Sequence, residues 1–164
     1  MIRAAFLFFA LAGGLALVVT DGLKAHSDPA AVVMARQGLM QSNGRSFGPL
    51  VAILKGESTD LAAAAAAAQT INDNITAAVL LFQAGTAKGE APGSRAKPEI
   101  WTERAEFEAA AAALIEASAN LVDAANSGDV DTFKAAFPAL GQACGGCHEG
   151  NPSAGGRFRF PAEG

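Results

Sequence analysis

The chain has 164 residues, enough for one domain, and 51% of them are hydrophobic. Its formal net charge is −4 at pH 7, and lysine and arginine do not cluster anywhere along it. Binding to phosphate backbones needs such clusters, so the sequence argues against nucleic acid as a partner.

Residues 1–27 have the pattern of a secretory signal peptide. Arg3 precedes an apolar run over residues 4–19, and small residues follow at Ala25 and Ser27. We predict cleavage and export to the periplasm. The alternative is an uncleaved anchor, but a membrane span takes about 20 apolar residues. Cleavage after Ser27 removes two basic residues and one acidic residue, which leaves a charge of −5 and no segment for stable membrane association.

The first helix of the mature chain is expected to begin at Asp28-Pro29 and to end at Gly56. Asp28 is a good N-cap, and proline is favoured at the first helical position. Gly44, Gly48 and Pro49 weaken or kink its later turns. Its apolar stripe includes Val32, Arg36, Leu39, Met40, Asn43, Phe47, Leu50, Val51 and Leu54.

Two further helices are predicted from hydrophobic spacings of three and four residues. The second begins near Ser58-Thr59-Asp60 and continues to Phe82, and a loop rich in glycine follows over residues 83–98. The third is expected to be one continuous helix over residues 98–127. Trp101 on it can touch a cofactor edge, although core packing is the commoner role of a large aromatic side chain.

The fourth helix is expected to continue through Pro138, because its stripe continues past that residue. The stripe consists of Val130, Phe133, Phe137, Leu140, Cys144 and Cys147. The two cysteines therefore belong to the core face. We predict an all-α, antiparallel up-down-up-down four-helix bundle over residues 28–149, with a cofactor between facing helices. Residues 150–164 are predicted to be a flexible extension.

Residues 144–148 form a C-x-x-C-H motif, which is typical of covalent haem c attachment. On a helix, Cys144, Cys147 and His148 share a face, so two thiols and an imidazole can meet one porphyrin. A thioredoxin-like pair requires a βαβ context, which is absent here. A zinc site lacks the usual four ligands, and a disulfide across so short a loop adds little stability. We therefore predict one covalent haem c with its iron.

Several strings of the chain resemble the class II c-type cytochromes, the cytochrome c′ superfamily. They are Arg36-Gln37-Gly38-Leu39-Met40, Phe47-Gly48, Lys55-Gly56-Glu57, Pro98-Glu99-Ile100-Trp101 and Ala143-Cys144-Gly145-Gly146-Cys147-His148. The resemblance implies that Cys144 and Cys147 are thioether anchors and that His148 is the proximal iron ligand. It also places Met40 where low-spin members carry a methionine ligand and five-coordinate members an apolar residue.

Arg36 lies one turn before Met40, and a buried arginine needs a partner. A haem propionate can be that partner, or the head can reach water while the stem packs. Many relatives carry a basic residue four positions after the ligand histidine, where this chain has Pro152. Arg157 or Arg159 of the tail can fold back to cover the propionates, although a loosely ordered tail is the expectation.

Two functions follow from these features. The first is a periplasmic electron carrier with His148 and Met40 as axial ligands, which exchanges single electrons with redox partner proteins and is no catalyst of its own. The second is a five-coordinate protein that binds NO or CO, which requires that Met40 only packs. Some relatives pair through their first two helices, so a monomer and a homodimer both stay open.

Overall fold

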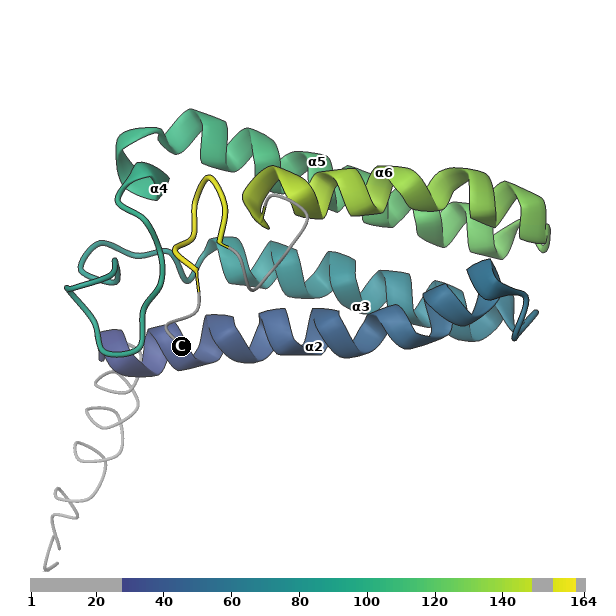
Figure 1. The fold of residues 1–164 in the computed structure, drawn as a ribbon, viewed down its shortest axis with the longest axis horizontal. Coiled ribbons are helices and arrows are strands. Elements are labelled where there is room, and N and C mark those ends of the chain that lie inside the picture. The colour runs from purple at the N-terminus through teal and green to yellow at the C-terminus, as the bar shows by residue number, and fades with distance from the viewer. Residues whose placement is uncertain (1–27, 149–154, 162–164) are drawn as a thin grey trace, which may run out of the picture.

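The computed structural model describes residues 28–148 and 155–161, so the predicted signal segment lies outside the described residues. Four long helices are α2 (Pro29–Lys55), α3 (Leu61–Val79), α5 (Arg104–Asn126) and α6 (Val130–His148), and α4 (Glu99–Thr102) is a single turn. The long helices lie alongside one another with alternating direction (Figure 1). The predicted four-helix bundle is confirmed.

The helix ends follow from local side-chain chemistry. The Asp28 carboxylate accepts a hydrogen bond from the Ala30 amide at 3.0 Å, and the Asp60 carboxylate accepts one from the Ala63 amide at 2.9 Å. Each bond satisfies an amide that the first helical turn leaves unpaired. Gly56 ends α2 with φ +74°, a left-handed conformation in which glycine carries no steric penalty.

The prediction of one helix over residues 98–127 is wrong at Glu103. This residue has φ −116° and ψ +50°, which separates α4 from α5. The break turns α4 so that Ile100, 1% exposed, joins Phe107 and Phe158 in a small apolar cluster. Burial of these apolar side chains stabilises the chain with the helix broken at Glu103.

The main core lies between the long helices and contains many alanines. The fully buried large side chains of this core are Phe133, Leu50, Ile53, Ile71, Leu121 and Leu140. The buried alanines of α3 and α5 are Ala64, Ala67, Ala68, Ala78, Ala111, Ala117, Ala124 and Ala125. The small alanine side chain lets α3 and α5 pack closely. It also buries little apolar area, so these helices contribute only a thin core.

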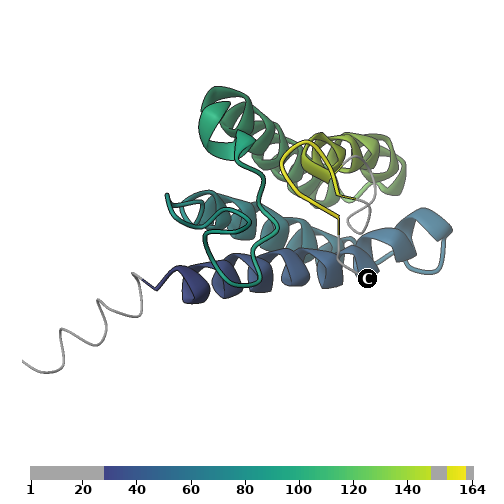
Figure 2. The same cartoon turned by 60° about the vertical axis from the view of Figure 1, so that its left-hand side comes forward.

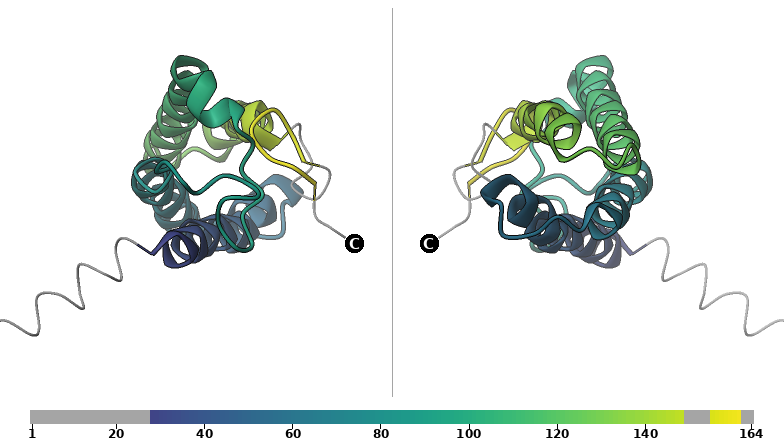
Figure 3. Two further views of the ribbon diagram at one scale, coloured as in Figure 1. Left: turned by 90° about the vertical axis from the view of Figure 1, so that its left-hand side faces the viewer. Right: turned by 90° about the vertical axis from the view of Figure 1, so that its right-hand side faces the viewer.

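Helices adjacent in sequence pack against one another, but α2 and α6 make few contacts. The bundle is therefore open along one side. End-on views show the loop between α3 and α4 and the C-terminal segment 155–161 on that side, between α2 and α6 (Figure 3). The same segment, drawn in yellow, lies across this side in the turned view (Figure 2).

The C-terminal segment 155–161 is packed, in contrast to the flexible extension that its composition predicts. Phe158 is only 3% exposed, and its ring meets Phe107 at a centroid distance of 5.4 Å. The Lys97 amide donates to the Phe158 carbonyl at 3.1 Å, and the Phe160 amide donates to the Arg95 carbonyl at 2.8 Å. One buried aromatic ring and paired backbone groups offset the entropy of ordering a short terminus.

Candidate haem site

A cavity of about 750 Å³ lies on the open side of the bundle, between α2 and α6. Its volume falls in the usual range of cofactor pockets, about 300–1,000 Å³. The lining residues from the two helices are Arg36, Gln37, Met40, Gln41, Asn43, Gly44, Phe47, Gly141, Cys144, Gly145, Cys147 and His148. All three residues of the predicted attachment motif thus share one cavity with Met40 and Arg36.

The attachment residues lie in the last turn of α6, which continues through Pro138 as predicted. Cys144 and Cys147 are partly buried free thiols. Burial, with a smaller contribution from the charge of Cys144, raises the pKa of Cys147 to about 11, and burial also raises the pKa of Cys144. Both sulfurs are therefore protonated thiols at neutral pH, and the predicted sequence spacing brings them to the cavity wall.

His148 ends the helix and lines the same cavity. Burial lowers its pKa below the ordinary value, and the positive charge of Arg95 lowers it further. The imidazole is therefore neutral at pH 7 and has a nitrogen lone pair available for a metal.

Met40 lines the cavity from α2, across from the attachment helix, and is partly buried against the main core. Phe47, the aromatic residue of the same helix, also lines the cavity and makes an edge contact with Phe137 at 6.2 Å between ring centroids. The wall opposite the attachment motif thus carries one thioether and one aromatic ring among the polar side chains of α2.

Arg36 lines the cavity, but its guanidinium group is held by the loop between α3 and α4. It donates to the Thr86 hydroxyl at 2.8 Å, to the Thr86 carbonyl at 2.7 Å and to the Ser94 hydroxyl at 2.7 Å. Its carbon Cζ also lies 4.7 Å from the centre of the Phe82 ring. Burial lowers the pKa of Arg36 to about 10, so the group stays charged at neutral pH. The predicted propionate contact of Arg36 stays a prediction.

Three features of the cavity fit a haem c. Two thiols and a neutral imidazole meet at one wall. A Cβ atom added to Gly44 or Gly141 would meet open space, so a flat ring can approach both helix backbones there. Arg95 reaches the cavity with a buried Nη1 that has no hydrogen-bond partner among the described residues. A haem would supply the ring, the iron and the acceptor.

Other parts of this site were not predicted from the sequence. Arg95, Thr86 and Ser94 belong to a loop without a motif, and only the folded loop places them beside α2. Trp101 does not line the cavity and packs against the small apolar cluster instead.

Among the described residues, no group of three or more His, Cys, Asp or Glu side chains could hold a metal ion by itself. In residues 28–148 and 155–161, no helix is long and apolar enough for a membrane span.

A helical bundle with the attachment motif on its last helix defines a c-type cytochrome of class II. The family model for cytochrome c′ matches residues 31–150, and the chain belongs to this family, whose members bind one covalent haem c. The chain is 38% identical over 145 residues to a cytochrome c-556 of Rhodopseudomonas palustris, which covers 85% of this chain and 92% of the relative.

Solved structures of the family have the same fold. The crystal structure of cytochrome c′ from Rubrivivax gelatinosus has a TM-score of 0.68 and 30% identity, covering 80% of this chain and 97% of that one. A nitric oxide complex of a cytochrome c prime variant from Alcaligenes xylosoxidans has a TM-score of 0.68 and 28% identity, covering 81% and 97%. These comparisons show the family and do not support the methionine-ligated subtype expected from the sequence.

Proposed function

We propose that this protein is a periplasmic haem c protein that binds a diatomic gas, NO or CO, on the haem face opposite His148. The observation that carries this proposal is the likeness to cytochrome c prime from Alcaligenes xylosoxidans, whose structures include nitric oxide complexes. These comparisons favour gas binding over the electron carrier expected from the sequence.

Three apolar side chains of the cavity wall, Met40, Phe47 and Ile75, support this proposal. NO and CO are small and weakly polar, so an apolar pocket accommodates them without charged partners. The haem iron supplies the coordination site for the gas. Helix α6 would hold the imidazole of His148 on the proximal side, and Met40, Phe47 and Ile75 would supply apolar contacts on the distal side.

A second candidate function is the His/Met electron carrier, and one observation favours it. Met40 and His148 line the same cavity from different helices. A thioether is a soft ligand that suits haem iron, and His/Met ligation raises the reduction potential for electron transfer. If Met40 binds iron, gas must first displace it, so the two functions make opposite demands on this residue.

The two functions are separated by an absorption spectrum of the reduced protein, made with a c-type maturation system. A five-coordinate gas binder gives a broad high-spin spectrum and binds CO rapidly. In that case Met40→Leu leaves both properties nearly unchanged, because the side chain only packs. Stopped-flow CO binding and the reduced spectrum measure these outcomes.

Sharp, split α and β bands in the wild type would contradict the gas-binding proposal. Conversion of that spectrum to a high-spin form by Met40→Leu, with a large gain in CO binding rate, would then establish the carrier. Ile75→Leu is a matched control, because it alters another cavity wall by a similar amount without removing a possible ligand.

The remaining predictions on location and partners belong to this proposal. Export by residues 1–27 places the protein in the periplasm, where haem c is attached in the family. Met34 and Leu80, 66% and 74% exposed, are the large exposed hydrophobic side chains among the described residues, and both belong to the first half of the bundle. Single exposed side chains of this kind are normal on a monomer, so a monomer and a homodimer both stay predictions. In either state, redox partner proteins would supply or accept the electron that sets the iron's oxidation state.

A further inference from the structure

The haem cavity contains more positive charge than its walls balance. Arg36, Arg95 and Arg159 all line it, and none of the described residues that line it is Asp or Glu. The whole chain is acidic, with a net charge of −4, so this is a local excess. A charge withdrawn from water without a partner is costly, so the cavity favours an anionic occupant.

Arg36 already has hydrogen-bond acceptors within the protein, so its charge does not require an anionic occupant. Its guanidinium donates three short hydrogen bonds to Thr86 and Ser94, which come from the loop above α2. These bonds satisfy much of the donor capacity of the group. The excess charge is therefore carried by Arg95 and Arg159.

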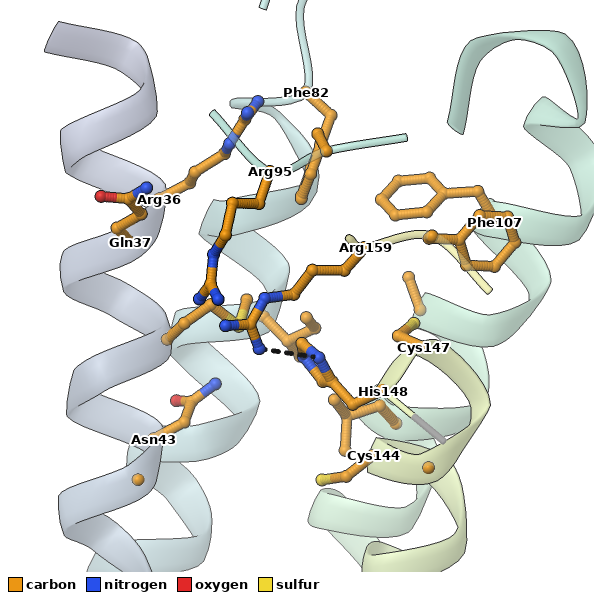
Figure 4. A pocket seen from close by; sticks show the side chains of 18 of the residues that line it. Arg36, Gln37, Asn43, Phe82, Arg95, Phe107, Cys144, Cys147, His148 and Arg159 are labelled. Carbon is orange, nitrogen blue, oxygen red and sulfur yellow. Dashed lines mark hydrogen bonds between the residues drawn. The ribbon is translucent and has the colours of Figure 1, made fainter. Parts of the chain in front are cut away.

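Arg95 lacks a partner on the side that faces the cavity. Its Nη1 is buried and makes no hydrogen bond with any described residue. Its side chain lines the same cavity as His148 and lies beside that of Arg159 (Figure 4). A buried guanidinium nitrogen without an acceptor marks a place where an acceptor belongs.

Arg159 reaches the same cavity from the C-terminal segment 155–161. Its Nη1 lies 3.3 Å from Nδ1 of His148, and the side chain points toward α2 alongside Arg95 (Figure 4). Its position is fixed by its neighbours in the segment: Phe158 is buried, and the backbone of Arg159 pairs with that of Ala96. The same pairing therefore sets Arg95 and Arg159 beside each other.

The position of the segment is also fixed sterically. A Cβ atom at Gly156 would overlap the carbonyl oxygen of Cys147 and lie 2.7 Å from Cα of His148. The Lys97 ammonium group donates to the Gly156 carbonyl at 2.6 Å. The segment thus packs directly on the last turn of the attachment helix.

We propose that Arg95 and Arg159 form a two-arginine site for the propionate carboxylates of the haem, with Arg159 delivered by the C-terminal segment 155–161. Guanidinium groups bind carboxylates in pairs of charge-assisted hydrogen bonds. This site gives the chain a basic group beside His148 even though Pro152 occupies the position where many relatives have one. It rests on the covalent haem c and is the same for either function of the distal side.

The test uses the haem-loaded protein and the variants Arg95→Gln and Arg159→Gln. Each removes a positive charge from the carboxylates, so the remaining negative charge stabilises Fe(III) and the midpoint potential falls. The propionate bands of the resonance Raman spectrum shift in both variants, since these bands respond to hydrogen bonding of the carboxylates. A crystal structure of the haem-loaded wild type shows both guanidinium groups within hydrogen-bond distance of propionate oxygens.

Arg157→Gln is the matched control, because Arg157 lies in the same segment but forms an exposed ion pair with Glu103 at 2.9 Å and does not line the cavity. It leaves the potential and the propionate bands unchanged. Arg159→Lys keeps the charge but loses the planar fork, so it retains most of the potential and still shifts the bands.

Three results would overturn the two-arginine site. One is unchanged propionate bands in Arg95→Gln and Arg159→Gln, both with wild-type helix content by circular dichroism. The second is an equal fall in potential in Arg157→Gln, which would assign the effect to the net charge of the segment. The third is a crystal structure in which the propionates point to Arg36 or to solvent.

Discussion

Arg36 shows how a single buried charge fixes a long loop. Arg36 is 5% exposed, and its guanidinium binds Thr86 and Ser94, which are 50 and 58 residues further along the chain. A buried charge is tolerated where hydrogen bonds replace its water, and these hydroxyl and carbonyl groups do so. The loop that carries Arg95 is therefore tied to α2.

Thr86→Val tests this role of Arg36. The substitution keeps the shape of the side chain but leaves one N–H of a buried guanidinium without its hydroxyl acceptor. We expect a loss of about 1–3 kcal/mol in the free energy of unfolding, measured by urea denaturation of the haem-loaded protein.

Thr76→Val is the control for that measurement, because Thr76 is exposed on α3 and its hydroxyl bonds only the Asn72 carbonyl. We expect its effect to stay within about 0.5 kcal/mol, as for ordinary surface substitutions. Equal losses in both variants would show that Thr86 contributes nothing beyond helix or loop propensity.

At the scale of elements, the C-terminal segment 155–161 and the last turn of α6 act as one unit. Gly156 permits their close approach, and Phe158 attaches the segment to the cluster under α4. The interruption at Glu103 belongs to the same arrangement, because Glu103 pairs with Arg157 and the turned α4 supplies Ile100 to the cluster. Composition alone predicts neither feature.

Gly156→Ala tests the close approach. The added methyl group overlaps the backbone of Cys147, so the segment must move off α6. We expect faster cleavage of the C-terminus in limited proteolysis, with unchanged helix content by circular dichroism.

Gly38→Ala is the matched control for the glycine, because a Cβ at this exposed position on α2 meets nothing within 4 Å. It stabilises α2 by about 0.5–1 kcal/mol and leaves the cleavage rate at the C-terminus as in the wild type. A wild-type cleavage rate in Gly156→Ala would show that the segment does not depend on this contact.

For the whole molecule, the bundle has a thin core and one open side. The buried alanines of α3 and α5 allow those two helices to pack closely. Helices α2 and α6 are separated by a cavity of about 750 Å³. A haem bound in this space would place apolar surface between the two helices. Most of the packing between α2 and α6 is therefore expected to come from the cofactor.

The variant Cys144→Ala with Cys147→Ala, prepared without haem, tests this dependence. We expect a lower melting temperature and a measurable loss of helix by circular dichroism, since apolar area between α2 and α6 is left exposed. Thermal unfolding equal to that of the haem-loaded wild type would contradict it. Leu54→Ala is a useful comparison, because it removes apolar area from α2 at a site that does not line the cavity.

The sequence predicts helix boundaries well where interactions within a few residues set them. Asp28, Asp60 and Gly56 mark helix ends through bonds and backbone angles within a few residues, so the helix boundaries near them follow from sequence. The break at Glu103 could not be predicted in this way, because its cause is the cluster formed with Phe158, more than 50 residues away.

The sequence by itself determined that Cys144, Cys147 and His148 share one helical face, which is the arrangement that the predicted haem attachment requires. It also determined that Met40 belongs to the apolar stripe of the first helix. Only the tertiary structure decided which arginines face the cavity. Arg36 is bound by a loop, whereas Arg95 and Arg159 converge from two segments that pair at Ala96 and Arg159. Such partners are set by the free energy of packing the whole chain, which no local pattern encodes.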